Sequence, residues 1–126
     1  MNRRVLMVCL ILLACLGGAP AFAKEEGTLK AKLIAVLKAN AGGECPASLM
    51  VPMLRDACEQ QMTVMKKQLK KLGAIQRPQY KGNEKLPNGI ETEVYRVYFE
   101  NGSMLWIVAA GTDEKLAVMW SPGVAP

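Results

Sequence analysis

The side chains of this chain that could carry out chemistry are cysteines and acidic residues, because the sequence contains no histidine. A serine or cysteine nucleophile usually needs histidine as its base, and the common zinc sites combine histidine with cysteine. No acidic residue falls on the predicted core face of the strands: Glu93 and Glu100 lie at strand ends, Asp113 and Glu114 at a loop tip, and Asp56 and Glu59 off the apolar stripe of a helix. Carboxylates at such positions are usually solvated. The sequence therefore predicts no catalytic residue, no metal site and no cofactor.

The first 23 residues have the order of parts of a secretory signal peptide. Arg3 and Arg4 supply the basic start, Val5 to Leu16 the apolar run, and Ala21-Phe22-Ala23 the small-residue cleavage site. The apolar run is shorter than the roughly 20 residues of a membrane-spanning helix. We expect residues 1–23 to be a signal peptide and residues 24–126 to be a single periplasmic or secreted domain with a short mobile tail.

A lipid anchor is an alternative for the same segment. Leu12-Leu13-Ala14-Cys15 resembles the lipobox of bacterial lipoproteins, in which the cysteine becomes the acylated first residue. Soluble export and anchorage through Cys15 both stay open at this point.

Cys45 and Cys58 remain in the exported chain in either case. An even pair of cysteines in an oxidising compartment predicts a disulfide. For a loop of this size, the loop-entropy treatment gives a stabilisation of about 3 kcal/mol.

Two helices are predicted ahead of the strands. Thr28 is predicted to cap a helix that runs to about Asn40 and ends at Gly42-Gly43. A longer helix is predicted from about Pro52 to Leu72, with Gly73 as its terminator. Its apolar stripe comprises Leu54, Ala57, Cys58, Met62, Met65, Leu69 and Leu72. We expect this stripe to pack on the apolar face of the sheet.

The segment from Glu93 to Trp120 predicts a three-stranded meander. Asn101-Gly102 is a strong hairpin signal because both residues of the tight turn adopt positive φ, and it predicts that Val97 faces Trp106. A second loop over 111–115 would place Trp106 opposite Trp120. The core face would then comprise Tyr95, Val97, Phe99, Met104, Trp106, Val108, Leu116, Val118 and Trp120.

Residues 74–80 predict a further strand, which Pro78 restricts to an edge of the sheet. The predicted fold class is therefore α+β: two N-terminal helices packed on a curved antiparallel sheet of three or four strands.

The other face of the meander is more apolar than a solvent-exposed face usually is. Its candidate interaction residues are Tyr98, Leu105, Ile107 and Met119. Either the first helix covers this face, or the face associates with a partner protein or a second copy of the chain.

Lys66, Lys67, Lys70 and Lys71 form a weak basic patch near the end of the longer helix. They can complement the negative end of the helix, or they can dock anionic envelope material or an acidic protein. Sixteen basic residues less Arg3 and Arg4 leave 14 against 11 acidic ones, so the exported chain has a net charge of +3. A charge this mild does not indicate a nucleic-acid partner.

Met50, Met53, Met62 and Met65 suggest either an adaptable binding groove or a copper site. Two of the four lie on the predicted helix stripe, so core packing is the interpretation that we favour.

The run from Val94 to Gly102, with Leu105-Trp106 and the segment from Lys115 to Val118, resembles the C-terminal part of secreted bacterial domains of the nuclear-transport-factor-like, cystatin-like type. Leu72-Gly73-Ala74-Ile75 fits the same pattern. The resemblance covers about residues 45–120 and implies a helix in the concave side of a curved sheet. Members of that superfamily range from isomerases and dehydratases to non-catalytic accessory modules, so the resemblance does not choose a function.

Together these observations predict a small exported, non-catalytic binding or accessory module of the bacterial envelope, with a protein partner or a second copy as its ligand. One alternative is a small-molecule pocket protein or degenerate enzyme of the same superfamily. The other is an inhibitor or immunity protein against an envelope enzyme, although a net charge of +3 disfavours an inhibitor of a basic enzyme.

Overall fold

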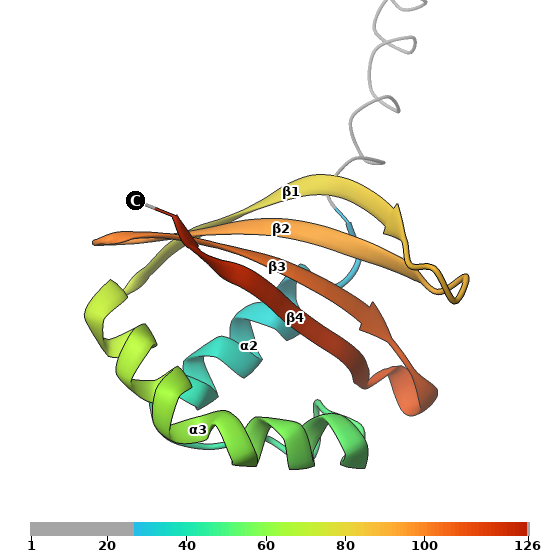
Figure 1. Cartoon of the computed structure of the whole chain (residues 1–126), viewed down its shortest axis with the longest axis horizontal. Helices are drawn as coiled ribbons and strands as arrows, with labels where there is room; N and C mark the ends of the chain where they lie inside the picture. The colour runs from blue at the N-terminus through green and yellow to red at the C-terminus, as the bar shows by residue number, and fades with distance from the viewer. Residues whose placement is uncertain (1–26, 126) are drawn as a thin grey trace, which may run out of the picture.

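The computed structural model describes residues 27–125, which form an α+β fold (Figure 1). Two helices, α2 (Lys30–Ala41) and α3 (Pro52–Leu72), precede the strands β1 (Ile75–Lys85), β2 (Glu91–Phe99), β3 (Gly102–Ala110) and β4 (Leu116–Ala125), with a 3-10 turn, η2 (Thr112–Glu114), before β4. The strands form one antiparallel sheet in the order β1-β2-β3-β4, which makes β1 and β4 its edges. The predicted α+β class, the antiparallel pairing of the strands and the order of helices before strands are confirmed. The predicted signal peptide, Cys15 and the expected start at Lys24 lie outside the described residues.

Helix α3 has the bounds that its local sequence predicts. Pro52 occupies the start of the helix, where its fixed φ and missing N–H carry no penalty. Gly73 follows the last turn with φ of 81°, a left-handed conformation that glycine adopts without strain.

Helix α2 begins at Lys30 and is not capped by the side chain of Thr28, so that part of the prediction is wrong. The carboxylate of Glu93 on β2 instead accepts the backbone N–H groups of Thr28 and Leu29 at 2.8 and 2.9 Å. A carboxylate makes a stronger, charge-assisted bond to these donors than a hydroxyl can, and its charge is favourable at the positive end of a helix.

The core of the sheet is filled by α2 rather than by the stripe of α3. Leu33, Val36 and Leu37 of α2 are fully buried in the same apolar cluster as the inward side chains of the sheet. Helix α3 buries only Leu69 and Leu72, near its C-terminal end. Figure 1 shows both helices on one side of the sheet. Leu54, Cys58 and Met65 of the predicted α3 stripe are half-buried against the same cluster, so the stripe contacts the core, but α2 occupies the middle of the sheet face.

The β2–β3 hairpin is shifted by two residues from the predicted register. Phe99 pairs with Gly102, so Val97 faces Met104 rather than Trp106. Contacts with the end of α3 hold the turn, because Asn101 donates its backbone N–H to the carbonyl of Leu72 at 2.9 Å. A shift of two residues keeps each side chain on its own face. The predicted core residues of these two strands are accordingly buried; they are Tyr95, Val97, Phe99, Met104, Trp106 and Val108.

Strand β4 departs from the predicted faces because it contains an extra residue. Ala110 pairs with Leu116 as predicted, but Ala109 pairs with Val118, which leaves Ala117 in a bulge. A one-residue slip moves every following side chain to the other face. Trp120, predicted to lie in the core, pairs with Ile107 and is 57% exposed.

Candidate functional site

A groove of about 390 Å³ separates α3 from strands β3 and β4. Its α3 wall is formed by Leu54, Ala57, Cys58, Gln61, Val64, Met65 and Gln68, its sheet wall by Met104, Trp106, Met119, Trp120, Ser121 and Gly123, and its remaining lining by Asn40 and Met50. None of these residues carries a charge. The volume lies in the usual range of about 300–1,000 Å³ for ligand sites, and apolar walls with a few polar groups are typical of them.

Two large apolar side chains are exposed to solvent at the border of the groove. Val64 on α3 is 71% exposed, and Trp120 on β4 is 57% exposed. Trp120 pairs with Ile107, which assigns it to the outer face of the sheet. Because β4 is the edge strand beside the groove, Trp120 also borders the groove. Exposed apolar residues gathered at one hollow are a usual mark of an interaction site.

Methionines from four different segments line the groove: Met50, Met65, Met104 and Met119. Thioether side chains are flexible and polarisable, which lets them adapt to ligands of different shape. Of the four methionines singled out in the sequence, Met53 is 83% exposed and Met62 lies in another hollow. The structure therefore does not bring these four methionines together in one hollow.

Trp106 contributes a polar atom without a partner. Its indole Nε1 is buried, and no acceptor among the described residues lies within hydrogen-bond distance of it. Leaving a buried donor unpaired costs about 1–3 kcal/mol. Trp106 lines the groove, but its N–H is covered by other atoms and is not open to a ligand there.

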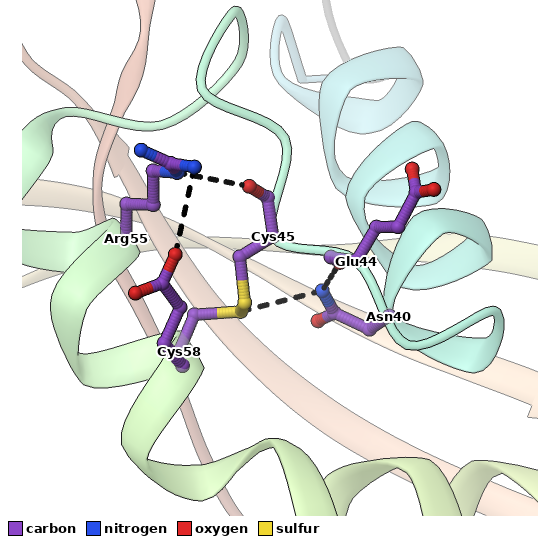
Figure 2. Close-up of polar contacts among 6 residues, drawn as sticks. Asn40, Glu44, Cys45, Arg55 and Cys58 are labelled. Atoms are coloured by element: carbon purple, nitrogen blue, oxygen red, sulfur yellow. Dashed lines mark hydrogen bonds and ion pairs between the residues drawn. A yellow bond between two sulfur atoms is a disulfide. The ribbon is translucent and has the colours of Figure 1, made fainter.

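The predicted disulfide is present between Cys45 and Cys58, whose Cα atoms are 6.1 Å apart. Figure 2 shows how it joins α3 to the segment after α2: the buried Asn40 side chain donates to the carbonyl of Glu44 at 2.8 Å and contacts Cys58 Sγ at 3.4 Å. Arg55 Nε donates to the carbonyl of Cys45 at 3.2 Å on the other side of the bridge. This cluster fixes the N-terminal half of α3, and with it one wall of the groove.

The segment before α3 covers the first residue of β4 and no more. Val51 donates its N–H to the carbonyl of Leu116 at 2.9 Å, and Leu116 donates to the carbonyl of Leu49 at 2.8 Å. Met50 and Leu116 therefore form an isolated parallel bridge. Beyond Leu116, no described strand pairs with the free edge of β4.

The basic patch divides into two parts. Lys67 and Lys71 line a second hollow of about 470 Å³ that shares Val64 and Gln68 with the groove. Lys66 and Lys70 are exposed but line neither hollow. The groove therefore has cationic groups beside one of its ends although its own lining is neutral.

The outer face of the sheet contains three of its four predicted residues: Tyr98, Leu105 and Ile107. Met119 was placed there wrongly, because the bulge at Ala117 turns it toward the core, where it pairs with Val108. The same bulge moves Val118 out of the predicted core to this face.

No described helix covers the outer face, because α2 packs in the cluster on the opposite side. Of the two alternatives for this face, cover by the first helix is therefore excluded. Side chains of the sheet itself shield part of the face: the Arg77 guanidinium lies 4.5 Å from the centre of the Tyr98 ring, and Ile107 is only 7% exposed. An association surface stays a prediction for what remains.

The side chains of two acidic residues, Glu93 and Glu100, accept backbone N–H groups. Burial raises the pKa of Glu93, but hydrogen bonds from Thr28, Tyr95 and Leu29 outweigh it, so the pKa lies below its usual value of 4.5. Burial, followed by the bond to Glu93, raises the pKa of Tyr95. Glu100 accepts the N–H of Ala74 at 2.7 Å. No acidic residue in the described part of the chain lines the groove.

No helix in the described part of the chain is long and apolar enough to cross a membrane. No protein-family model, curated protein or solved structure matches this chain.

The sequence alone did not reveal Asn40, Val64 or Trp120 as groove residues. Asn40 offered one signal, since it is a polar residue at an apolar position of its helix. Val64 offered another, because it is an apolar side chain just off the stripe of α3.

Proposed function

We propose that this chain is a small exported, non-catalytic binding module of the bacterial envelope and that it holds its ligand in the groove between α3 and β4. The observation that carries the proposal is the groove itself: about 390 Å³, lined by apolar and neutral side chains, and bordered by the exposed Val64 and Trp120.

The chemistry of the lining supports binding rather than catalysis. A general acid or base must lie within hydrogen-bond reach of the reacting group. The polar side chains that line the groove are Asn40, Gln61, Gln68 and Ser121, none of which is an effective proton acceptor near neutral pH.

Two features support export and the superfamily that the sequence resembles. The Cys45–Cys58 disulfide is typical of an oxidising compartment and agrees with a cleaved leader, with acylation at Cys15 as the alternative. A helix buried against one face of a curved antiparallel sheet agrees with the nuclear-transport-factor-like, cystatin-like type, which includes non-catalytic modules.

A pocket for a small apolar molecule is the second candidate. The groove volume of about 390 Å³ and its neutral lining favour it, because sites of that size with apolar walls and a few polar groups usually hold small ligands.

The test uses an apolar naphthylamine dye whose fluorescence rises on binding. Ala57 is exposed and lines the groove, so Ala57→Trp should fill the groove without disturbing the core. Gln60→Trp adds the same side chain at an exposed position of α3 that does not line the groove.

Dye binding should weaken about tenfold or more in Ala57→Trp, as expected when a contact worth about 1.4 kcal/mol is lost. It should be unchanged in Gln60→Trp and in Leu105→Asp, which alters the outer face. Loss of binding in Leu105→Asp alone would move the site to the outer face, and equal affinity in all variants would exclude the groove.

A further inference from the structure

We propose that the ligand is an extended peptide that adds to the free edge of β4 as a fifth strand, with alternate apolar side chains in the groove and an acidic residue beside Lys67 and Lys71. The inference rests on the proposed function and names the ligand of the same groove. In strand addition, main-chain hydrogen bonds supply affinity, and hollows for every second side chain supply selectivity.

The two edges of the sheet differ in how they are protected. Strand β1 carries Arg77, Pro78, Lys81, Glu84 and Lys85, which are the residue types that keep an edge from pairing with other chains. Strand β4 has the sequence LAVMWSPGVA and contains no charged residue. An uncharged edge strand of this length exposes unpaired N–H and C=O groups to any extended segment that fits beside it.

The chain itself already pairs with the free edge of β4 at Leu116, the first residue of the strand. The segment around Met50 pairs with Leu116 in a parallel bridge, and the chain then turns away at Pro52 into α3. From Val118 to Gly123 the edge has no partner among the described strands, and α3 lies across the groove from it. The structure thus contains the start of a fifth-strand position that the described chain does not continue.

A single peptide fits this edge better than a second copy of the chain. Besides the bulge at Ala117, β4 has a second irregularity between its pairs with Ile107 and Leu105, and Pro122 lies within it. Bulges increase the twist of a strand, and a proline removes a donor, so another flat sheet edge pairs poorly there. A flexible peptide can follow the twist, and α3 then covers its other side.

Charge indicates the chemistry of one end of the peptide. The groove lining is neutral, but the adjoining hollow is lined by Lys67 and Lys71, and the two hollows share Val64 and Gln68. An apolar segment followed by aspartate, glutamate or a terminal carboxylate would match this order.

The first experiment asks whether the main chain pairs. The probes are labelled peptides of about six to eight residues, a usual strand length, in which valine alternates with serine and the last two residues are glutamates. An edge strand uses only every second N–H toward its neighbour. N-methylation of one alternate set of amides should weaken binding about tenfold or more, while methylation of the other set should leave it unchanged.

The second experiment asks where the acidic end lies. Reversing both groove-end charges, in Lys67→Glu with Lys71→Glu, should weaken binding of the glutamate-ended peptide by about tenfold and favour a lysine-ended peptide. The matched control is Lys66→Glu with Lys70→Glu, which changes the net charge equally on the same helix and should have a much smaller effect.

Four outcomes would overturn the proposal. Equal binding of both N-methylated sets would show that no strand forms. Equal loss in the two lysine pairs would show that the charge acts only at long range. Displacement of the dye by laurate, but by neither peptide, would assign the groove to a lipid. A dimer in sedimentation that excludes the peptide would assign the edge to a second copy.

The dye experiment separates this proposal from the one on which it rests. If Ala57→Trp still abolishes dye binding while no peptide binds, the groove is a binding site for another ligand. If dye binding does not respond to Ala57→Trp, both proposals fail together.

Discussion

Glu93 holds Thr28 at the start of helix α2 although the two residues are 65 positions apart. The Glu93 carboxylate accepts the backbone N–H of Thr28 at 2.8 Å and its hydroxyl at 2.7 Å. The hydroxyl of Tyr95 donates to the same carboxylate at 2.7 Å. Since α2 fills the core, this contact sets where the helix begins relative to the strand that it covers.

Glu93→Ala should therefore lower the free energy of unfolding by about 1 kcal/mol, the usual loss when a helix loses its cap. Urea unfolding followed by circular dichroism at neutral pH measures the change. Glu91→Ala removes an exposed carboxylate from the same strand and should leave the midpoint near that of the wild type. Equal midpoints for all three proteins would show that the contact contributes nothing.

The same carboxylate predicts a loss of stability in acid. Folding lowers the pKa of Glu93 below 4.5, so the unfolded chain takes up this proton before the folded protein does. The stabilisation is complete above the unfolded pKa and disappears as the pH falls through the folded one. Between pH 6 and about pH 3, wild type should lose more stability than Glu93→Gln. Parallel urea midpoints for the two proteins would contradict the assignment.

The disulfide predicts a response to reductant. Replacing Cys45 and Cys58 with serine should lower the free energy of unfolding by about 3 kcal/mol, because the unfolded loop is no longer closed. Dithiothreitol should lower the urea midpoint of the wild type to about that of the double variant, and it should leave the midpoint of the double variant unchanged. A wild-type midpoint insensitive to full reduction, checked by thiol alkylation, would contradict the prediction.

The sequence predicted the features that depend on neighbouring residues. Pro52 and Gly73 mark the ends of α3 locally, and strict alternation from Tyr95 to Phe99 assigns a buried face whatever the register. The bulge at Ala117 was not predictable in this way. The same sequence is compatible with an extra residue in the loop before β4 or with an extra residue inside the strand. Which of the two helices fills the core was not predictable either, because it depends on how both helices fit against one sheet.

The groove could not be predicted because its walls come from segments far apart in the chain. The sequence showed methionines at helical spacing, which is equally consistent with a packed core. Only the fold shows that α3 packs on the core mainly at Leu69 and Leu72, so that Met65 borders a hollow together with Met119 of β4.

Trp106 allows its apolar area and its unpaired N–H to be measured separately. Trp106→Ala should cost about 3–5 kcal/mol, the usual range for a buried large aromatic residue. Trp106→Phe should cost much less, because it keeps a ring in the core and removes a donor whose burial costs about 1–3 kcal/mol. Urea midpoints measure both changes. A phenylalanine variant as unstable as the alanine variant would mean that the indole N–H has a partner in solution.

Replacing Trp120 should have little effect on stability, unlike replacing Trp106. Simple alternation along β4 would instead place both tryptophans in the core. The bulge at Ala117 turns the Trp120 side chain away from the core, and 57% of this residue is exposed. Trp120→Ala should therefore change the free energy of unfolding by less than about 1 kcal/mol, as surface substitutions usually do. Acrylamide should quench part of the wild-type tryptophan fluorescence strongly, and that part should be missing in Trp120→Phe, where only Trp106 remains. If both tryptophans resist quenching and Trp120→Ala unfolds the protein, the bulge is wrong and Trp120 belongs to the core.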